Sequence, residues 1–366
     1  NKSGEVEMSN SSNKTIQEIE VWKEGHRFPG SGVCYDSNKN QLHFWNDRLG
    51  FRPIYLYEKN EQLAWSDQLN QLLDFNDLNF SINNSAISDF LETGYLSGLC
   101  TWFEEVTLLP PASHWIYTLT DKTWNKTQYW NWGKIKAVYL DFDQAVDLLA
   151  VKLREAVAES LSGKKGQVGI SLSGGLDSRA LLALAKENQE VVCYTFGIES
   201  SWDVKIAKQV AMTAGVAHHI FPLTESNWMD GRKEAIWRSD GMKSLIHLHQ
   251  VPVEQETAYL ADWNLNGFLG GVALGGIDVG LDLEVVYDRA RRFSLAGVWE
   301  WDQSLPQLVP FADFKLLEYL YGLPTEYRKG NRLFSACLRK HFPELFSTIP
   351  WQRTGLNLKQ GRLNRM

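Results

Sequence analysis

One stretch of the chain, GISLSGGLDSRALLALA at residues 170–186, combines residue types that can bind an anion. A hydrophobic run leads into Ser173, Gly174 and Gly175, and an alanine- and leucine-rich run follows. The pattern predicts a strand, a glycine turn and a helix whose first amide groups lack partners and carry partial positive charge. The glycines would let phosphate oxygens approach the main chain, and the hydroxyls of Ser173 and Ser178 would donate hydrogen bonds to them.

Asp177 lies in the same stretch and needs a different role, because a carboxylate and a phosphate repel each other. We predict that Asp177 binds a Mg²⁺ ion that bridges the phosphates, since this hard cation takes carboxylate oxygens as ligands. The loop is not a Walker loop, because it lacks the lysine of GxxxxGK[ST]. The alternative is a glycine-rich turn capped by serine that binds no ligand.

Other residues could also do chemistry, and each has a structural alternative. Asp203 opens a predicted helix, where it either caps the helix or reaches the nucleotide. His247 and His249 could share one face of a strand and bind a metal, but without cysteine or acidic neighbours substrate contact or packing is favoured. Cys34 lies in a predicted strand and is interpreted as a small core residue rather than a nucleophile.

Strands and helices must alternate in the second part of the chain to position these residues. Hydrophobic periodicity predicts a long amphipathic helix with Asp143 near its cap and Gly163 just past its end. It also predicts strands over 167–173, 190–198 and 218–223, and helices over 178–187, 202–214 and 226–238. After Asn266 the pattern is mainly helical. This alternation predicts a parallel sheet with both faces covered.

The first part of the chain, from Ile19 to about Trp132, is mostly β in pattern. Short apolar strands alternate with Asn, Asp, Gly and Lys turns, and two helices are expected near 67–75 and 85–96. We therefore expect two domains, 1–135 and 136–366. The first is a smaller α+β domain, and the second is an α/β domain with a doubly wound parallel sheet.

The amino-acid composition limits the classes of partner and the cellular compartment that we expect for this protein. The net charge of −7 argues against a nucleic-acid partner. No apolar run approaches the roughly 20 residues that span a bilayer, and nothing at the start resembles a targeting segment, so no membrane association is expected. The 4 cysteines form no CxxC pair, which favours reduced thiols in a cytoplasm. The many aromatic residues allow a homodimer.

The SGGLDS stretch resembles the SGGxDS loop of the PP-loop ATP pyrophosphatases, which cleave ATP between the α- and β-phosphates and adenylate a substrate. Its surroundings resemble the asparagine synthetase family within that group. YTFGI and WDVKIAKQVAMTAGVAHHIFPLT are similar to the family's second strand, helix and following strand. VPFADFKLLEYLYGLP resembles its R-x-PF-x-D segment, and RLFSACLRKHFPELFSTIPWQRTG resembles its terminal region.

The first domain resembles a class II glutamine amidotransferase domain. HFWNDRLGFRPIYLY is similar to the RDxxGxxPLYY hairpin of such domains. These domains normally begin with a cysteine whose free α-amino group activates its thiol, and Asn1 cannot take this role. We therefore expect a truncated domain without glutaminase activity.

The resemblance implies a nucleotide site built from the loop and from glycine positions elsewhere. The residues implied are Leu172, Ser173, Gly174, Gly175, Asp177, Ser178, Phe196, Gly197, Gly270 and Gly271, with the main chain of Phe196 and Gly197 against adenine. The family's SGxGxDExFGG loop corresponds to NGFLGGVALGGIDVGLDLE here, and the acidic pair is missing. Asp278 could replace it as a second Mg²⁺ ligand beside Asp177.

Three catalytic residues are implied as well: Asp177, Arg339 and Asp288. Asp288 and Arg291 match a D-x-x-R segment of the family and would form an ion pair. The family places a lysine about four residues before the LR of this region, where Phe334 or Ser335 stands here, with Lys329 and Arg332 nearby.

The resemblance thus implies an ATP- and Mg²⁺-dependent ligase. A carboxylate of a small molecule or peptide would attack the α-phosphorus of ATP, and an amine or ammonia would then displace AMP to form an amide. Family relatives that close β-lactams or lasso peptides work without glutamine hydrolysis. Two alternatives stay open: a degenerate homologue that binds nucleotide or acts as a scaffold, and a PP-loop enzyme of tRNA or sulfur chemistry, which the acidic charge and the missing cysteine pair disfavour.

Overall fold

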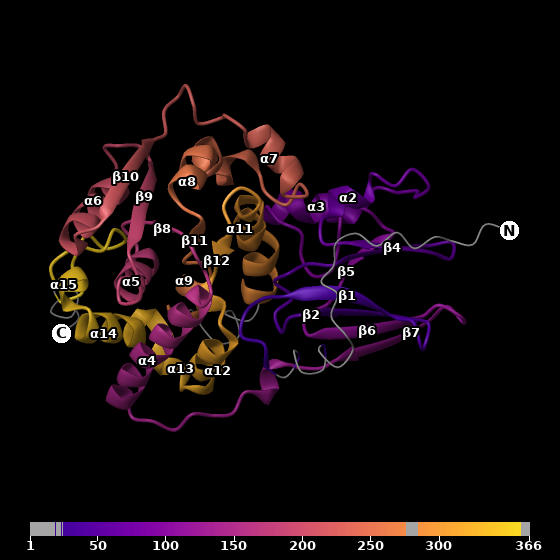
Figure 1. Cartoon of the computed structure of the whole chain (residues 1–366), viewed down its shortest axis with the longest axis horizontal. Coiled ribbons are helices and arrows are strands. Elements are labelled where there is room, and N and C mark those ends of the chain that lie inside the picture. Colours follow the sequence, from indigo (N-terminus) through magenta and orange to yellow (C-terminus); the bar gives the residue numbers. More distant parts are fainter. Residues whose placement is uncertain (1–18, 20–22, 24, 276–284, 360–366) are drawn as a thin grey trace. The chain divides into compact units, whose positions relative to one another are not determined.

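Antiparallel and parallel strands occupy separate parts of the chain. The structure is a computed structural model that describes residues 19, 23, 25–275 and 285–359. The chain divides into two units, Asn1–Lys134 and Ile135–Met366 (Figure 1). None of the helices within the described ranges is both long and apolar enough to cross a membrane.

The first unit contains two antiparallel sheets. One has the order β1-β2-β6-β7 and the other the order β4-β3-β5. Their bounds are β1 Ser31–Asp36, β2 Gln41–Asn46, β3 Tyr55–Lys59, β4 Gln62–Ser66, β5 Val106–Leu108, β6 Ser113–Thr118 and β7 Thr123–Gln128. Helices α2 (Leu69–Leu72) and α3 (Asn84–Thr93) and the 3₁₀ turn η1 (Trp132–Lys134) complete it. Buried residues of both sheets, among them Phe44, Leu56 and Tyr117, share one core, which confirms an α+β domain.

The amidotransferase-like hairpin of this unit is organised by a buried carboxylate. Asp47 follows β2 and is fully buried. It accepts hydrogen bonds from the main-chain N–H groups of Gly30, Leu49, Phe51 and Arg52 at 3.0–3.2 Å. These bonds determine the path of the chain from β2 to β3, because they satisfy amide groups that no strand partner could reach.

The second unit is built on one parallel sheet with the order β10-β9-β8-β11-β12. The strands are β8 Val168–Ser171, β9 Val191–Gly197, β10 Ala217–Pro222, β11 Trp263–Leu265 and β12 Gln307–Leu308. The chain moves outward from β8 to β10, then returns to the other side of β8 with β11. This reversal confirms the expected doubly wound sheet and creates a switch point between β8 and β11.

Helices cover both faces of this sheet, and Figure 1 shows α6 and α8 on opposite sides of β9. Val192 and Tyr194 of β9 pack against Trp301 of α11 and the chain after α8. The helices are α4 Phe142–Leu161, α5 Leu176–Ala185, α6 Trp202–Ala214, α7 Arg232–Arg238, α8 Glu254–Leu260, α9 Gly270–Ala273, α11 Leu295–Asp302, α12 Phe314–Gly322, α13 Thr325–Arg328, α14 Arg332–His341 and α15 Pro343–Phe346. Short turns η2 (Leu245–His247), η3 (Val251–Val253), η5 (Pro310–Ala312) and η6 (Lys329–Asn331) and the π-helical segment η4 (Val286–Ser294) lie between them.

Several predicted boundaries need correction. The cap of α4 is Asp141, whose side chain forms a capping box with Gln144, so the helix begins before Asp143. Helix α7 begins only at Arg232, because Gly231 adopts a left-handed φ of 68° and interrupts the predicted helix. His247 ends the 3₁₀ turn η2, so His247 and His249 do not share a strand.

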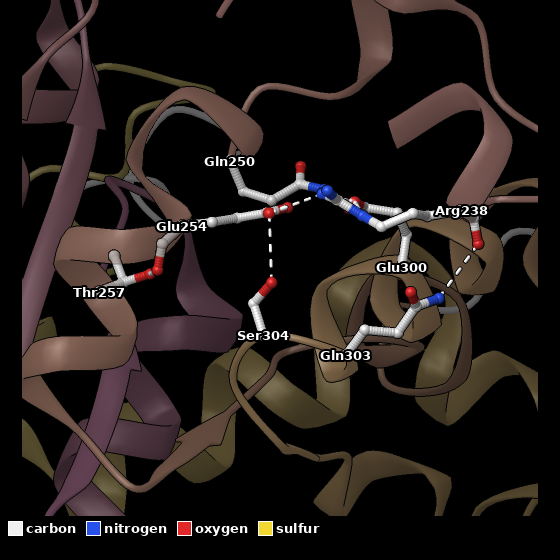
Figure 2. Close-up of polar contacts among 7 residues, drawn as sticks. All are labelled: Arg238, Gln250, Glu254, Thr257, Glu300, Gln303 and Ser304. Atoms are coloured by element: carbon white, nitrogen blue, oxygen red, sulfur yellow. Dashed lines mark hydrogen bonds and ion pairs between the residues drawn. The ribbon is translucent and has the colours of Figure 1, made fainter. Parts of the chain in front are cut away.

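A buried polar network joins three helices of the second unit (Figure 2). The guanidinium of Arg238 on α7 donates to Glu254 at the start of α8 (2.7 Å) and to Glu300 on α11. Gln250 donates to Glu300 (2.9 Å), and Ser304 donates to Glu254 (3.2 Å). The two glutamates are 6% and 1% exposed, so both carboxylates are out of water.

One guanidinium therefore faces two buried carboxylates. Burial, together with the charge of Glu300, raises the pKa of Glu254 to about 8. Glu254 thus retains a proton at neutral pH, because ionising a buried carboxylate beside a second one costs free energy in a low dielectric.

We predict that the unfolding free energy falls by about 1–2 kcal/mol between pH 7 and 9 and that Glu254→Gln abolishes this fall. The pKa of Glu254 in the folded state lies above its ordinary value of 4.5, so its contribution is complete below that value and is lost as the pH rises through about 8. Urea unfolding at several pH values measures the effect. Glu256→Gln, at an exposed position of the same helix, should retain the wild-type fall. An identical fall in Glu254→Gln would contradict the assignment.

Candidate active site

Two loops meet at the switch point of the parallel sheet. One follows β8 and leads through Ser173–Gly175 into α5, and the other follows β11 and leads through Gly267 into α9. An added Cβ at Gly267 would lie 3.2 Å from the Cβ of Asp177, so the loops pack closely. In doubly wound sheets, ligands bind in the crevice at this edge. The structure therefore brings the predicted loop and the second glycine segment together.

Hydrogen bonds within the loop engage the predicted phosphate donors. The main-chain N–H of Ser173 donates to the hydroxyl of Ser178 (3.0 Å), and the two hydroxyl oxygens are 2.9 Å apart. The N–H of Gly175 donates to the hydroxyl of Ser173 (3.2 Å). The loop is thus pre-shaped, and a phosphate would have to replace some of these bonds.

Asp203 does not cap its helix, and its contact with the nucleotide remains a prediction. The cap of α6 is Ser201, whose side chain accepts from the N–H of Val204 (3.4 Å). The carboxylate of Asp203 instead accepts from the N–H of Gly174 (2.7 Å). Asp203 therefore holds the loop against the first turn of α6.

The remaining predicted nucleotide residues lie along β8 and β9. Leu172 is buried, its N–H donates to the carbonyl of Tyr194 (2.8 Å), and its carbonyl accepts from the Thr195 hydroxyl (2.7 Å). Leu172 thus extends the pairing of the two strands and positions the loop. Phe196 and Gly197 end β9, and the carbonyl of Gly197 accepts from Leu223 (3.0 Å). Their contact with adenine remains a prediction.

Asp177 faces the second loop across a space that only glycine leaves open. A Cβ at Gly270 would lie 2.6 Å from the Cγ of Asp177, whereas one at Gly271 would lie 3.9 Å from the nearest carboxylate oxygen. The half-buried carboxylate makes no hydrogen bond to a described residue, and burial raises its pKa to about 7. A desolvated carboxylate without a protein partner fits a divalent cation, which would restore its charged state.

Asp177 is the predicted Mg²⁺ ligand that the structure describes, and the nearby Asp203 carboxylate is bonded to Gly174. Asp278 lies outside the described residues, and within those ranges no group of three or more His, Cys, Asp or Glu converges. One carboxylate is nevertheless sufficient, because Mg²⁺ is commonly bound by one or two carboxylates together with substrate phosphates and water.

The other two predicted catalytic residues lie on separate elements. Asp288 is in η4, where the Nε of Arg291 donates to the carbonyl of Tyr287 (2.8 Å). Arg339 is on α14 and lines a cavity with Lys329 and Arg332. Their catalytic roles remain predictions.

Arg179 is a residue beside the candidate site that the sequence reasoning missed. Its guanidinium is buried and donates to the carbonyls of Gly174 (3.2 Å) and Pro350 (2.9 Å), and also to those of Leu345 and Ile349. Burial lowers its pKa to about 10, so it stays charged at neutral pH. An arginine within the apolar run SRALLALA was the available signal, since a buried cation in a helix needs acceptors.

Comparison with known proteins matches both units. Residues 148–252 match the family model of asparagine synthase, and residues 31–130 match that of the glutamine amidotransferase domain.

The curated relatives are similar in the same way. Asparagine synthetase B of Escherichia coli is 24% identical over 372 residues, which cover 88% of this chain and 59% of that protein. A putative asparagine synthetase of Methanocaldococcus jannaschii is 24% identical over 174 residues, 46% of this chain and 33% of that protein. A probable asparagine synthetase of Acanthamoeba polyphaga mimivirus is 40% identical over 76 residues, 20% and 14%. The chain spans less than two thirds of each of these relatives, and all three are glutamine-hydrolysing synthetases by name. The chain thus has a region that matches the glutamine amidotransferase domain followed by one that matches asparagine synthase, and it is similar to asparagine synthetases that contain both.

Proposed function

We propose that this chain is an ATP-dependent ligase that forms amide bonds by adenylating a carboxylate. The observation that carries the proposal is the Asp177 carboxylate, which has no protein partner among the described residues and faces Gly270 at the switch point. The start of α5 adds amide groups without intrahelical acceptors at the same place. The carboxylate could bind a cation, and the amide groups could bind the polyphosphate that the cation accompanies.

The proposed reaction has two steps. A carboxylate oxygen of the acid attacks the α-phosphorus of ATP, and the bond to the bridging oxygen breaks to release pyrophosphate. An amine nitrogen then attacks the carbonyl carbon of the acyl-adenylate, loses a proton and displaces AMP. The loop and the start of α5 would bind the departing pyrophosphate, and Asp177 would hold Mg²⁺, which supplies charge neutralisation of the phosphates.

The loop must exchange hydrogen bonds to do this. The amides of Ser173, Gly174 and Gly175 donate to protein oxygens in this structure. The serine hydroxyls can rotate toward a phosphate oxygen at little cost, whereas the Asp203 carboxylate would repel it. We expect Gly174 to keep its bond to Asp203, leaving the serines and the amides of α5 as the phosphate donors.

The amine would be ammonia or a second substrate rather than a product of glutamine hydrolysis in this chain. Burial and the charge of Asp36 raise the pKa of the Cys34 thiol to about 11, so it is not a thiolate at neutral pH. The acid would be a small molecule or a peptide, as in the β-lactam- and lasso-forming relatives. A cytoplasmic location, a homodimer and the absence of nucleic-acid partners also belong to this proposal, supported by the acidic charge and the free cysteines.

A non-catalytic homologue is the second candidate. The internal bonds of the loop favour it, because a relic that binds no phosphate would also satisfy its own amides. Binding of ATP with Mg²⁺ separates the two candidates.

We predict that Asp177→Asn weakens binding of ATP with Mg²⁺ by about 10–100-fold, since one charge-assisted contact is lost. Isothermal titration with and without Mg²⁺ measures it, and pyrophosphate release against a panel of acids measures turnover. Asp230→Asn removes an exposed carboxylate on another loop and should bind as the wild type does. No heat with the wild-type chain would rule out the ligase and favour the relic.

We predict that Gly270→Ala weakens the same binding by about tenfold or more and that Gly271→Ala leaves it nearly unchanged. Both substitutions add one methyl group to α9 and raise its helix propensity alike. Only the first places a Cβ against Asp177, at 2.6 Å from its Cγ. Thermal unfolding checks that both variants fold, and equal affinities would show that the carboxylate does not bind the ligand.

A further inference from the structure

A buried lysine in the second unit takes no part in the proposed reaction. Lys243 lies in the chain after α7, and its side chain is only 9% exposed. Its ammonium group carries three donors, yet it makes no hydrogen bond or ion pair with a residue in the described ranges. Buried lysines are normally paired, because taking an unpaired charge out of water costs free energy. The packing contacts of Lys243 do not satisfy these donors.

Three basic side chains from separate segments surround the ring of Phe293 on η4. The Nζ of Lys243 lies 4.6 Å from the centre of this ring, and the Cζ of Arg289 lies 5.4 Å from it. The imidazole of His247, at the end of η2, meets the ring edge to face with 4.9 Å between centroids. Arg289 and His247 are exposed, whereas Lys243 is buried. The amine is therefore the inner member of a cluster whose outer members reach solvent.

Helix α11 leaves space for this amine through a glycine. A Cβ added at Gly297 would lie 2.6 Å from the Nζ of Lys243 and 3.0 Å from its Cδ. The lysine side chain thus crosses α11 at Gly297 before it reaches Phe293. Two elements, α11 and η4, together determine where the amine lies.

The surroundings of the amine favour its neutral form. Burial lowers the pKa of Lys243 to about 8, the charge of Glu300 opposes this shift, and the charge of Arg289 adds to it. The carboxylate of Glu300 is itself bonded to Arg238 and Gln250. About a tenth of the Lys243 side chains are then neutral amines at pH 7. The neutral amine is the nucleophilic form of lysine.

The neighbours of the amine indicate which electrophile suits it. Arg289 makes no ion pair with a carboxylate among the described residues, and a guanidinium binds an oxyanion in a planar contact with two hydrogen bonds. Desolvation, followed by the charges of Lys243 and Arg289, lowers the pKa of His247, so this imidazole is mostly neutral at pH 7 and can exchange protons. A small carbonyl compound with a carboxylate or a phosphate could therefore bind Arg289 and present its carbonyl carbon to Lys243.

We propose that Lys243 forms an imine with an aldehyde or ketone that carries an oxyanion. The lone pair of Nζ attacks the carbonyl carbon, and one proton moves from the nitrogen to the oxygen to give a carbinolamine. The oxygen then leaves as water with the second proton of the nitrogen, and the carbon–nitrogen double bond forms. Nothing is oxidised or reduced in this step. The proposal goes beyond the ligase reaction and does not require ATP.

Reductive trapping in the full chain tests this proposal. Glyoxylate carries a carboxylate, glycolaldehyde phosphate carries a phosphate, and acetaldehyde carries no oxyanion. Cyanoborohydride reduces each imine to a stable secondary amine, which peptide mass mapping assigns to a residue. At pH 7 one of the two anionic probes should label Lys243 about tenfold or more faster than Lys205, an exposed lysine on α6. The faster probe identifies the preferred oxyanion.

Two variants test the geometry and the oxyanion separately. Gly297→Ala displaces the flexible end of Lys243 without changing any charge, so it should slow labelling of Lys243 by about fivefold or more. Arg289→Gln should slow labelling by the preferred anionic probe about fivefold more than labelling by acetaldehyde. Thermal unfolding checks that both variants fold.

Three outcomes would overturn the imine site. The first is labelling of Lys243 that is no faster than that of Lys205, and the second is labelling by acetaldehyde as fast as by either anionic probe. The third is labelling that neither variant changes.

Labelling is measured without ATP or Mg²⁺, which separates this proposal from the proposed function. A chain that is labelled at Lys243 but does not bind ATP would retain the imine site and reject the ligase. A chain that binds ATP but is not labelled faster at Lys243 would reject the imine site alone.

Discussion

The buried guanidinium of Arg179 is the interaction on which the arrangement of the synthase-type unit depends. Its Nη2 donates to the carbonyl of Gly174 in the loop after β8 and to that of Pro350, and its Nη1 donates to the carbonyls of Leu345 and Ile349. Burying a cation costs free energy unless acceptors surround it, and here the acceptors come from both segments. The guanidinium therefore holds the loop and this segment together. The segment then continues as Trp351 into the wall of the cavity that Arg339 lines. One side chain thus positions the loop after β8 relative to the segment around Pro350.

The reversal of strand order between β8 and β11 supplies the second constraint. It places two glycine segments at one edge of the sheet and leaves Asp177 facing Gly270. Gly270 matters because it has no side chain: a methyl group at this residue would occupy the space beside the Asp177 carboxylate. A carboxylate in that position, half-buried and without a protein partner among the described residues, supports the proposed cation.

Buried charge is used differently elsewhere in the same unit. Arg238, Glu254 and Glu300 bond to one another and so link α7, α8 and α11. Lys243 lacks such a partner within the described ranges and lies over the ring of Phe293 instead. The contrast between satisfied and unsatisfied charge distinguishes a structural network from a candidate binding site.

The sequence by itself determined the local chemistry and the class of fold. The pattern of Ser173–Ser178 between apolar runs specifies a strand, a turn and a helix, and the alternation that follows specifies a parallel sheet, because both depend on neighbours in the chain. The helix boundaries at Asp141 and Arg232 and the turn at His247 were harder to predict, since caps and left-handed residues override periodicity there. Only the tertiary structure decided that Asp203 holds the amide of Gly174, that Gly270 lies against Asp177, and that Arg339 shares a cavity with Trp351. These contacts join residues far apart in the chain, and the order of strands and the packing of helices, rather than any local pattern, bring them together.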